Sequence, residues 1–222
     1  MTPIRIDFVS DVACPWCAVG LNALEAALDK LDGEVAVEIA FQPYELNPDM
    51  PAEGADTVQY LGAKYGIDAA QIARNQAAIR ERGAEVGFTF GTRSRVWNTF
   101  DAHRLLHWAG LQSPAAQRAL KHGLLKAYHG EGRNPGAADV LVAVASAVGL
   151  DAQAARAVLD SGQFTDEVRA AEQRWHQAGI SAVPSVVIND EYLIQGGQPA
   201  DTFERALRQI ASEMVGGPGA AA

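Results

Sequence analysis

The only two cysteines of this 222-residue chain lie three positions apart, in the segment Cys14-Pro15-Trp16-Cys17. A pair this close in sequence cannot staple distant parts of a fold, so a disulfide-stabilised secreted scaffold is excluded. The chain has to build its core by packing, and its length and 48% hydrophobic residues suffice for one sizeable domain or one domain carrying an insertion. The first question is therefore what chemistry the cysteine pair performs.

The cysteine motif lies between a predicted strand and a predicted helix. Apolar and polar residues alternate from Ile4 to Val9, which is typical of a strand. Leucines then recur at spacings of three and four, which predicts a helix from Pro15 to Leu31. Pro15 suits the first helical turn, because its missing N–H has no partner to lose there.

The start of a helix is a suitable place for a reactive thiol. Unpaired N–H groups and the positive end of the helix dipole stabilise an anion, so we expect the pKa of Cys14 to be lowered. The thiolate is the nucleophile in disulfide exchange. Cys14 precedes the helix and is assigned the attacking role, whereas Cys17, inside the first turn, is the more buried resolving thiol.

The remaining pattern predicts an α/β fold whose strands are interrupted by helices. A second strand is expected at 35–41, and two further strands, at 184–188 and 191–194, form a hairpin before a last helix at about 199–214. Between them the chain is rich in alanine and in apolar residues at helical spacing. The helices expected there are Thr57–Tyr65, Asp68–Val86, Asn98–Ala109, Pro114–Tyr128, Ala137–Val148, Asp151–Asp160 and Phe164–Gln177.

The predicted element order is β-α-β, a helical block, then β-β-α. We assign residues 1–56 and 179–215 to one α/β domain and residues 57–178 to an inserted helical domain. The glycine- and alanine-rich segment 216–222 is expected to be a disordered tail. Gly110, Gly149 and Gly179 stand where helix ends are expected, and Ser113 and Asp151 are candidate N-caps.

A second signal is Val183-Pro184, directly before the third predicted strand. Only X-Pro bonds have an appreciable cis population. A proline that opens a strand lacks the N–H for the sheet ladder, which leaves adjacent backbone free to pair with a substrate chain. Such prolines are common, and this one is informative only beside the cysteine motif.

These features together resemble the thioredoxin fold and, more closely, the DsbA family of thiol-disulfide oxidoreductases in its cytoplasmic FrnE-like branch. The resemblance runs from Ile4 to about Met214 and rests on three segments: Asp11-Val12-Ala13-Cys14-Pro15-Trp16-Cys17, Pro43-Tyr44-Glu45-Leu46-Asn47-Pro48 and Gly179-Ile180-Ser181-Ala182-Val183-Pro184. It implies that the insertion caps the active site, that Pro184 is cis and packs beside the disulfide, and that Val183 offers its backbone to an extended substrate. Cys14 and Cys17 would be catalytic, with Pro15, Trp16, Val183 and Pro184 supporting them.

The chain departs from the strongly oxidising members of that family at Trp16. Those members carry a histidine between the cysteines, which helps to stabilise the thiolate. Trp16 has no charge to offer, so we expect the pKa of Cys14 to be lowered less and the reduction potential to be less oxidising.

A rival interpretation comes from Asn98-Thr99-Phe100-Asp101-Ala102-His103-Arg104, which resembles a segment of the kappa-class glutathione transferases and of 2-hydroxychromene-2-carboxylate isomerase. Those enzymes share the fold, bind glutathione and have a serine in place of Cys14. Three hypotheses stay open: a protein dithiol-disulfide oxidoreductase without a cofactor, a glutathione-dependent transferase or isomerase, and a chaperone-like peptide binder. The expected partners are thiol- or disulfide-containing proteins or peptides, with glutathione as an alternative co-substrate. Asn98 itself is at least as well explained as a helix N-cap.

Other classes of site are disfavoured. Zinc would need two ligands beyond the cysteines, and His103 and His107, four apart on one predicted helix, are better explained as ordinary helix residues. Arg93 and Arg95 could bind an anion, but they are more simply explained as solvated charges. A net charge of −9 argues against nucleic-acid binding, and the absence of a signal-like or membrane-spanning run suggests a cytosolic protein without a membrane partner.

Overall fold

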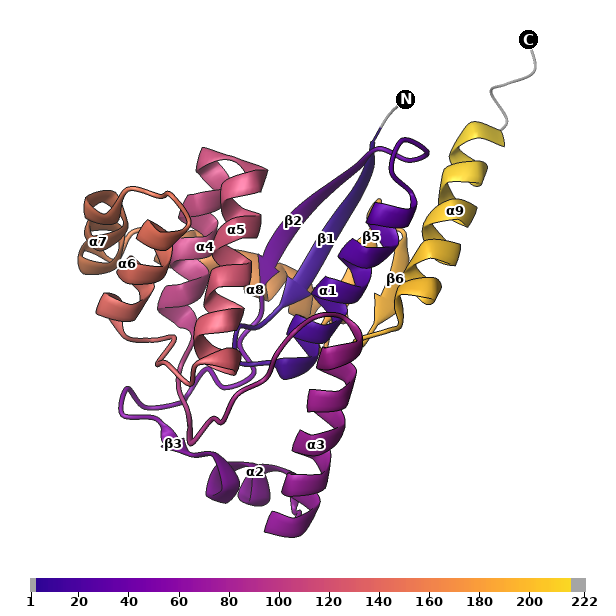
Figure 1. Cartoon of the computed structure of the whole chain (residues 1–222). Coiled ribbons are helices and arrows are strands. Elements are labelled where there is room, and N and C mark those ends of the chain that lie inside the picture. Colours follow the sequence, from indigo (N-terminus) through magenta and orange to yellow (C-terminus); the bar gives the residue numbers. More distant parts are fainter. Residues whose placement is uncertain (1–2, 217–222) are drawn as a thin grey trace.

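The computed structural model describes residues 3–216 and is organised around one four-stranded sheet of order β2-β1-β5-β6 (Figure 1). β1 pairs in parallel with β2 and antiparallel with β5, and β6 pairs antiparallel with β5. The sheet therefore joins both ends of the chain across the whole helical block, which confirms the expected thioredoxin-like α/β fold with a helical insertion. Its strands are β1 (Ile4–Ser10), β2 (Val37–Pro43), β5 (Ser185–Ile188) and β6 (Tyr192–Gln195).

The apolar positions of β1 form one face of the sheet, as their alternation predicts. Ile4, Ile6 and Phe8 are all buried in the core that α1 (Pro15–Lys30) and α9 (Ala200–Gly216) cover. Figure 1 shows these two helices side by side in front of the strands. Because this core fixes the start of α1 against the end of β1, it also fixes the cysteine motif.

The opposite face of the sheet is covered by α8 (Thr165–Gln177). Trp175 of this helix is buried with Val9, Tyr44 and Ile180 in a small separate cluster. The boundaries 57–178 of the inserted domain stay a prediction, and α8 within them packs directly on the sheet.

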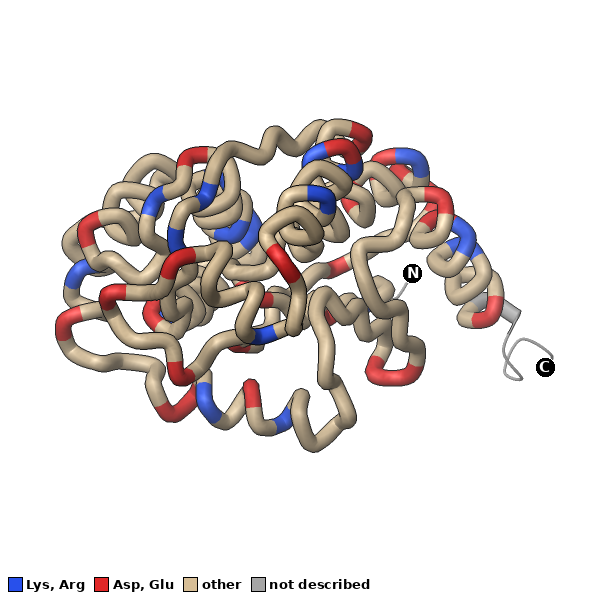
Figure 2. The backbone as a smooth tube through the Cα atoms, turned by 90° about the horizontal axis from the view of Figure 1, so that it is seen from below, with Lys and Arg blue, Asp and Glu red and all other residues tan. Residues whose placement is uncertain are grey.

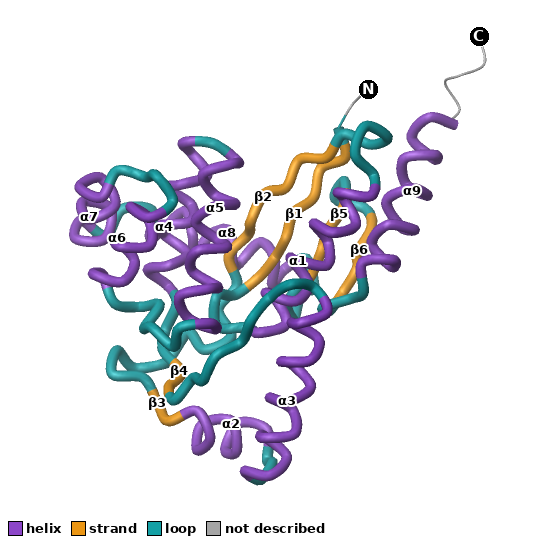
Figure 3. Tube along the Cα trace, viewed as in Figure 1, coloured by secondary structure: helices purple, strands orange, loops and turns teal. Residues whose placement is uncertain are grey.

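The helical block has its own core, which is built mainly from four helices and the π-helix that follows α5. Figure 3 shows α2 and α3 as a separate arm, away from the bundle of α4 to α7. A loop leads from α3 past the start of α1 to β4, which pairs with β3 in a short two-stranded sheet. The elements of the block are β3 (Ala55–Asp56), α2 (Thr57–Tyr65), α3 (Ala69–Glu85), β4 (Arg95–Val96), α4 (Phe100–Gln112), α5 (Pro114–Leu125), η1 (Lys126–Gly130), α6 (Ala138–Ala147) and α7 (Ala152–Ser161).

Ser113, Asp151, Gly149 and Gly179 stand at helix ends as expected, and Gly110 is the exception. Ser113 accepts a hydrogen bond from Ala116 N, and Asp151 accepts one from Ala154 N, so both are N-caps. Gly110 was expected at a helix end but lies inside α4. A Cβ there would lie 2.8 Å from the Gln117 amide, so this glycine serves close packing of α4 on α5 rather than termination.

Charged residues of both signs are spread along the whole fold, as Figure 2 shows from below. Within residues 3–216, every helix is too short or too polar to span a lipid bilayer. α9 ends at Gly216, and the rest of the predicted disordered tail lies outside the described residues.

Candidate active site

Cys14 occupies the N-cap position of α1, with Pro15 following in the first turn. The Cys14 side chain caps no N–H group of its own helix. Its sulfur instead lies 3.5 Å from the carbonyl oxygen of Val183, to which its thiol donates. The structure thus brings together the two segments that the sequence singled out, although 169 positions separate them.

Cys17 lies directly behind Cys14, inside the first turn of the helix. The backbone N–H of Cys17 donates to the carbonyl of Cys14, and both cysteines are free thiols. Cys14 is 4% exposed and Cys17 is 0% exposed, in the order expected of an attacking and a resolving thiol. Burial raises the pKa of the Cys17 thiol well above its usual range, and a hydrogen bond to the Cys14 sulfur adds to this effect.

The Val183–Pro184 peptide bond is cis, and Pro184 packs against the same helix that carries the cysteines. Gly20 makes this approach possible, because a Cβ on Gly20 would lie 3.0 Å from Pro184 Cγ and 3.3 Å from Gly197 Cα. The N–H of Val183 has no hydrogen-bond partner within residues 3–216. It remains free to pair with an added extended chain.

Asp11, three residues before Cys14, is a fully buried carboxylate that sequence reasoning used only as part of the motif. It accepts hydrogen bonds from Ala13 N, Leu46 N and Thr99 Oγ1, at 2.9, 2.7 and 2.7 Å. His103 Nε2 lies 3.4 Å away. Burial alone would raise the pKa of Asp11, but His103 and the backbone N–H groups outweigh it and hold that pKa below its usual value.

A second buried histidine fixes the loop next to the cysteine. His129 Nε2 lies 2.8 Å from the carbonyl oxygen of Val12, so this nitrogen carries the proton and donates it. Burial lowers the pKa of His129 well below its usual value, and the ring is neutral. Two histidines of the helical insertion, His103 and His129, therefore contact the loop that precedes Cys14.

Cys14 opens onto a cleft of about 670 Å³ between the motif, the Val183 segment and the arm formed by α2 and α3. Pro15 and Trp16 also line it, and Trp16 is 36% exposed. Much of the remaining wall is aromatic or apolar, from residues that include Tyr44, Tyr60, Tyr65, Ile72 and Val96.

Two cations, Lys64 and Arg93, line the same cleft, and the sequence had suggested anion binding for Arg93 alone of the two. Lys64 donates to the carbonyl of Leu46 and to Asn47 Oδ1, both at 2.8 Å. Arg93, expected as a solvated charge, donates to the hydroxyl of Tyr128 at 3.2 Å and lies over its ring. Within residues 3–216, neither side chain forms an ion pair with a carboxylate, which leaves positive charge available to a ligand in the cleft.

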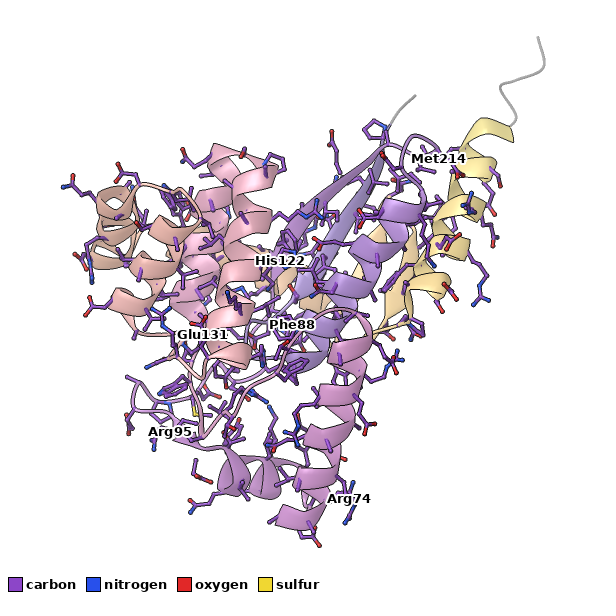
Figure 4. The ribbon with its side chains drawn as sticks, in the orientation of Figure 1. Arg74, Phe88, Arg95, His122, Glu131 and Met214 are labelled. Atoms are coloured by element: carbon purple, nitrogen blue, oxygen red, sulfur yellow. The ribbon has the colours of Figure 1, made fainter. Side chains whose placement is uncertain are left out.

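Arg95 was also expected to be a solvated charge, but it holds the loop before β3. It donates to the carbonyls of Glu53 and Gly54, and its position beside β3 is labelled in Figure 4. Arg95 therefore has a structural role outside the cleft.

The segment at 45–48 is held from the insertion as well. Arg169 bonds Glu45 and Glu172, and Asn98 donates to Glu45 Oε1 at 3.0 Å. Asn98 also accepts a hydrogen bond from Phe100 N at 2.8 Å, directly before α4. The N-cap position of α4 is Thr99, so the N-cap interpretation of Asn98 is wrong by one residue.

The histidines considered as zinc ligands do not join the cysteines. His103 faces Asp11, and His107 packs on Phe164, 5.1 Å between ring centroids. In the part of the chain that the structure describes, no three His, Cys, Asp or Glu side chains gather as a metal site would require. His103 is, however, not the ordinary helix residue that its pattern suggested, because it is buried against the loop that carries Cys14.

Comparison with known proteins agrees with this geometry. The family model of the DSBA-like thioredoxin domain matches residues 5–208. The crystal structure of a probable DsbA oxidoreductase, SCO1869 from Streptomyces coelicolor, is 34% identical and has a TM-score of 0.88, covering 95% of this chain and 91% of that one.

Two more distant structures share the fold. A 2-hydroxychromene-2-carboxylate isomerase is 17% identical with a TM-score of 0.73, covering 95% of this chain and 98% of its own. The cytosolic disulfide reductase DsbM from Pseudomonas aeruginosa, solved with glutathione, is 16% identical with a TM-score of 0.65, covering 94% of this chain and 99% of its own. The expected FrnE-like branch stays a prediction.

Proposed function

Because this chain belongs to the family of DSBA-like thioredoxin domains, we propose that Cys14 and Cys17 form a redox-active dithiol that exchanges electrons with protein thiols and disulfides. The observation that carries the proposal is the contact of Cys14 Sγ with the Val183 carbonyl, at 3.5 Å, on the wall of an open cleft. A purely structural role for the two thiols would not account for a Cys14 that lines this cleft.

The two thiols differ in the way that a two-step exchange requires. Cys14 thiolate attacks one sulfur of a substrate disulfide, a mixed disulfide forms, and one substrate thiolate leaves. Cys17 thiolate then attacks Cys14 Sγ, the mixed disulfide breaks, and the second substrate thiolate leaves. Two electrons pass to the substrate, and Cys14 and Cys17 are left joined by a disulfide. The oxidising direction runs the same steps in reverse.

An extended polypeptide fits the surroundings of Cys14. The unpaired N–H of Val183 offers a backbone hydrogen bond to a chain laid beside it. The aromatic and apolar cleft wall gives room for the neighbouring substrate side chains. We therefore propose peptide segments that contain a cysteine or a disulfide as substrates. Cytosolic reduction is the setting that we propose, in line with the description of DsbM as a cytosolic disulfide reductase.

Turbidity from insulin reduction by dithiothreitol is the direct test. The wild-type protein should accelerate it, and Cys14→Ser should abolish the acceleration. Cys17→Ser should instead trap a mixed disulfide, visible as an adduct by intact-mass measurement. An acceleration that survives Cys14→Ser would overturn the proposal.

Glutathione is a second candidate partner, because two cations without a carboxylate partner line the cleft of Cys14. Lys64 and Arg93 are placed to meet carboxylates of a small acidic thiol or disulfide. Isothermal titration with glutathione should show binding that weakens in Arg93→Met and at raised salt. Catalysis on a small molecule that needs glutathione and persists in Cys14→Ser would favour a transferase or isomerase, whereas holdase activity in the double cysteine variant would favour a peptide binder.

A further inference from the structure

The resolving step poses a problem that the cleft does not solve. Cys17 has to give up its proton before it attacks, yet burial and its hydrogen bond to Cys14 both favour the protonated thiol. Cys17 is 0% exposed and is not among the residues that line the cleft. In the mixed disulfide, the substrate occupies the cleft beside Cys14. The group that stabilises the Cys17 thiolate therefore has to lie in the protein interior.

Lys121 lies on α5 of the insertion, one turn before Leu125, which is part of the same buried core as Cys14 and Cys17. Its side chain is 0% exposed, and its ammonium has no hydrogen-bond partner within the described residues. Burial lowers the pKa of Lys121, whereas Cys17, Asp11 and Cys14 favour its charged form, and that charge in turn favours the Cys17 thiolate. A buried cation without a hydrogen-bond partner is costly, so a nearby thiolate would stabilise it.

The other charged groups around the thiols are already engaged. Asp11 is saturated by Ala13, Leu46, Thr99 and His103. The neutral His129 of η1 donates its N–H to the carbonyl of Val12. Arg93 donates to the hydroxyl of Tyr128.

Towards the outer side of α1 and α5, Glu25 pairs with Arg118 and His122; the last is labelled in Figure 4. Among the cations near the two cysteines in residues 3–216, Lys121 is thus the one without a hydrogen-bond partner.

A second cavity, of about 300 Å³, is lined by residues of β2, α4 and α5 that include Lys121 but neither cysteine. The side chain of Lys121 is nevertheless 0% exposed, so water in this cavity does not reach its ammonium. The charge of Lys121 is therefore not screened by water.

We propose that Lys121 is a positioning residue for the resolving step, and that its ammonium stabilises the thiolate that Cys17 forms as it attacks. The Cys17 S–H bond breaks, and its sulfur forms the bond to Cys14 Sγ as the mixed disulfide breaks. The departing substrate sulfur takes up the proton. This inference rests on the proposed oxidoreductase function.

A stopped-flow reaction of the reduced protein with dithiobis(nitrobenzoate) separates the two steps. Each released aromatic thiolate absorbs, so the first phase reports attack by Cys14 and the second reports resolution by Cys17. Lys121→Met keeps the length of the side chain and removes its charge. We expect its first phase to be close to that of the wild type and its second phase to be slower by about tenfold, because the pKa of Cys17 rises further when the ammonium is removed.

The pH profile distinguishes this role from a structural one. The second phase of Lys121→Met and of Lys121→Gln should need a higher pH to reach its maximum than that of the wild type. Lys126→Met, which removes an exposed charge five positions further on, is the matched control and should leave both phases unchanged.

An unaltered second phase in Lys121→Met would overturn the inference. Loss of the first phase in both Lys121 variants would do so too, because it would show that the residue only maintains the fold. A wild-type protein without a second phase would instead refute the oxidoreductase function itself.

Discussion

Asp11 Oδ1 lies 3.4 Å from His103 Nε2, although 92 positions separate the two residues in the sequence. Asp11 belongs to the loop that carries Cys14, and His103 belongs to α4 of the insertion. The contact is buried at both ends, at 0% and 2% exposure. The insertion is therefore part of the support of the active-site loop, and it does more than cover a finished site.

Asp11→Asn should lower the free energy of unfolding by about 1–3 kcal/mol at neutral pH, because the amide cannot accept all the hydrogen bonds of the carboxylate. The folded-state pKa of Asp11 lies below its ordinary 3.8, so its contribution to stability is present above that pH. The contribution is lost as the pH falls through the lower folded-state value. Urea unfolding from neutral pH down to about pH 2 should therefore show a smaller acid-induced loss in the variant than in the wild type. Parallel curves would contradict this account of Asp11.

Gly20→Ala tests the packing of Pro184 against α1. Helix propensity alone would favour alanine by about 1 kcal/mol. The new Cβ, however, would lie 3.0 Å from Pro184 Cγ and 3.3 Å from Gly197 Cα, and overpacking of this kind costs about 1–3 kcal/mol. We expect a lower melting temperature and a reduced rate of insulin reduction. A more stable and fully active variant would show that Pro184 has room to move.

The sheet and the cysteine motif could be predicted from local sequence alone. Alternation in β1 and leucine spacing in α1 are properties of neighbouring residues, and they place Cys14 at a helix start without tertiary information. The hairpin of β5 and β6 and most helix limits follow from the same kind of signal. The exposure order of Cys14 and Cys17 follows too, since it depends on helix geometry.

The supporting residues could not be predicted, because each is defined by packing between distant segments. His103 and Lys121 look like ordinary polar positions on amphipathic helices until α4 and α5 are placed against the cysteine loop. Arg93 lies in a loop whose path past α1 has no local signature. Gly110 looked like a helix end, and only the position of Gln117 shows why a glycine is needed inside α4.

Trp16→His should make the protein a stronger oxidant. A histidine between the cysteines can carry a charge that stabilises the Cys14 thiolate, and a stabilised thiolate favours the reduced form. Equilibration with glutathione buffers should place the wild-type potential below the about −120 mV of DsbA, with a rise of at least about 30 mV in the variant. Trp16→Phe, which changes the ring without adding a charge, should stay near the wild type. A wild-type potential as high as that of DsbA would refute the argument.

Arg169→Met should expose how the segment at 45–48 is held. Arg169 lies between Glu45 and Glu172, whose side chains are 2% and 8% exposed, and its own side chain is 47% exposed. Without it, two nearly buried carboxylates lose their shared cation. We expect a loss of about 1–3 kcal/mol, less than for a fully buried pair because solvent screens the exposed guanidinium.

The loss on Arg169→Met should depend on pH in a defined direction. Burial raises the pKa of Glu45 above its ordinary 4.5, and Arg169 opposes that rise. In the variant the pKa should rise further, so the deficit in unfolding free energy should be largest at neutral pH and shrink as Glu45 becomes protonated. Urea unfolding at neutral pH and at about pH 4.5 measures the difference.

Arg156→Met is the matched control, since its partner Asp139 is 92% exposed, and it should change stability by less than about 0.5 kcal/mol at both pH values. An equal deficit for Arg169→Met at the two pH values would show that the lost contact with Phe100, and not the unpaired carboxylates, sets the cost.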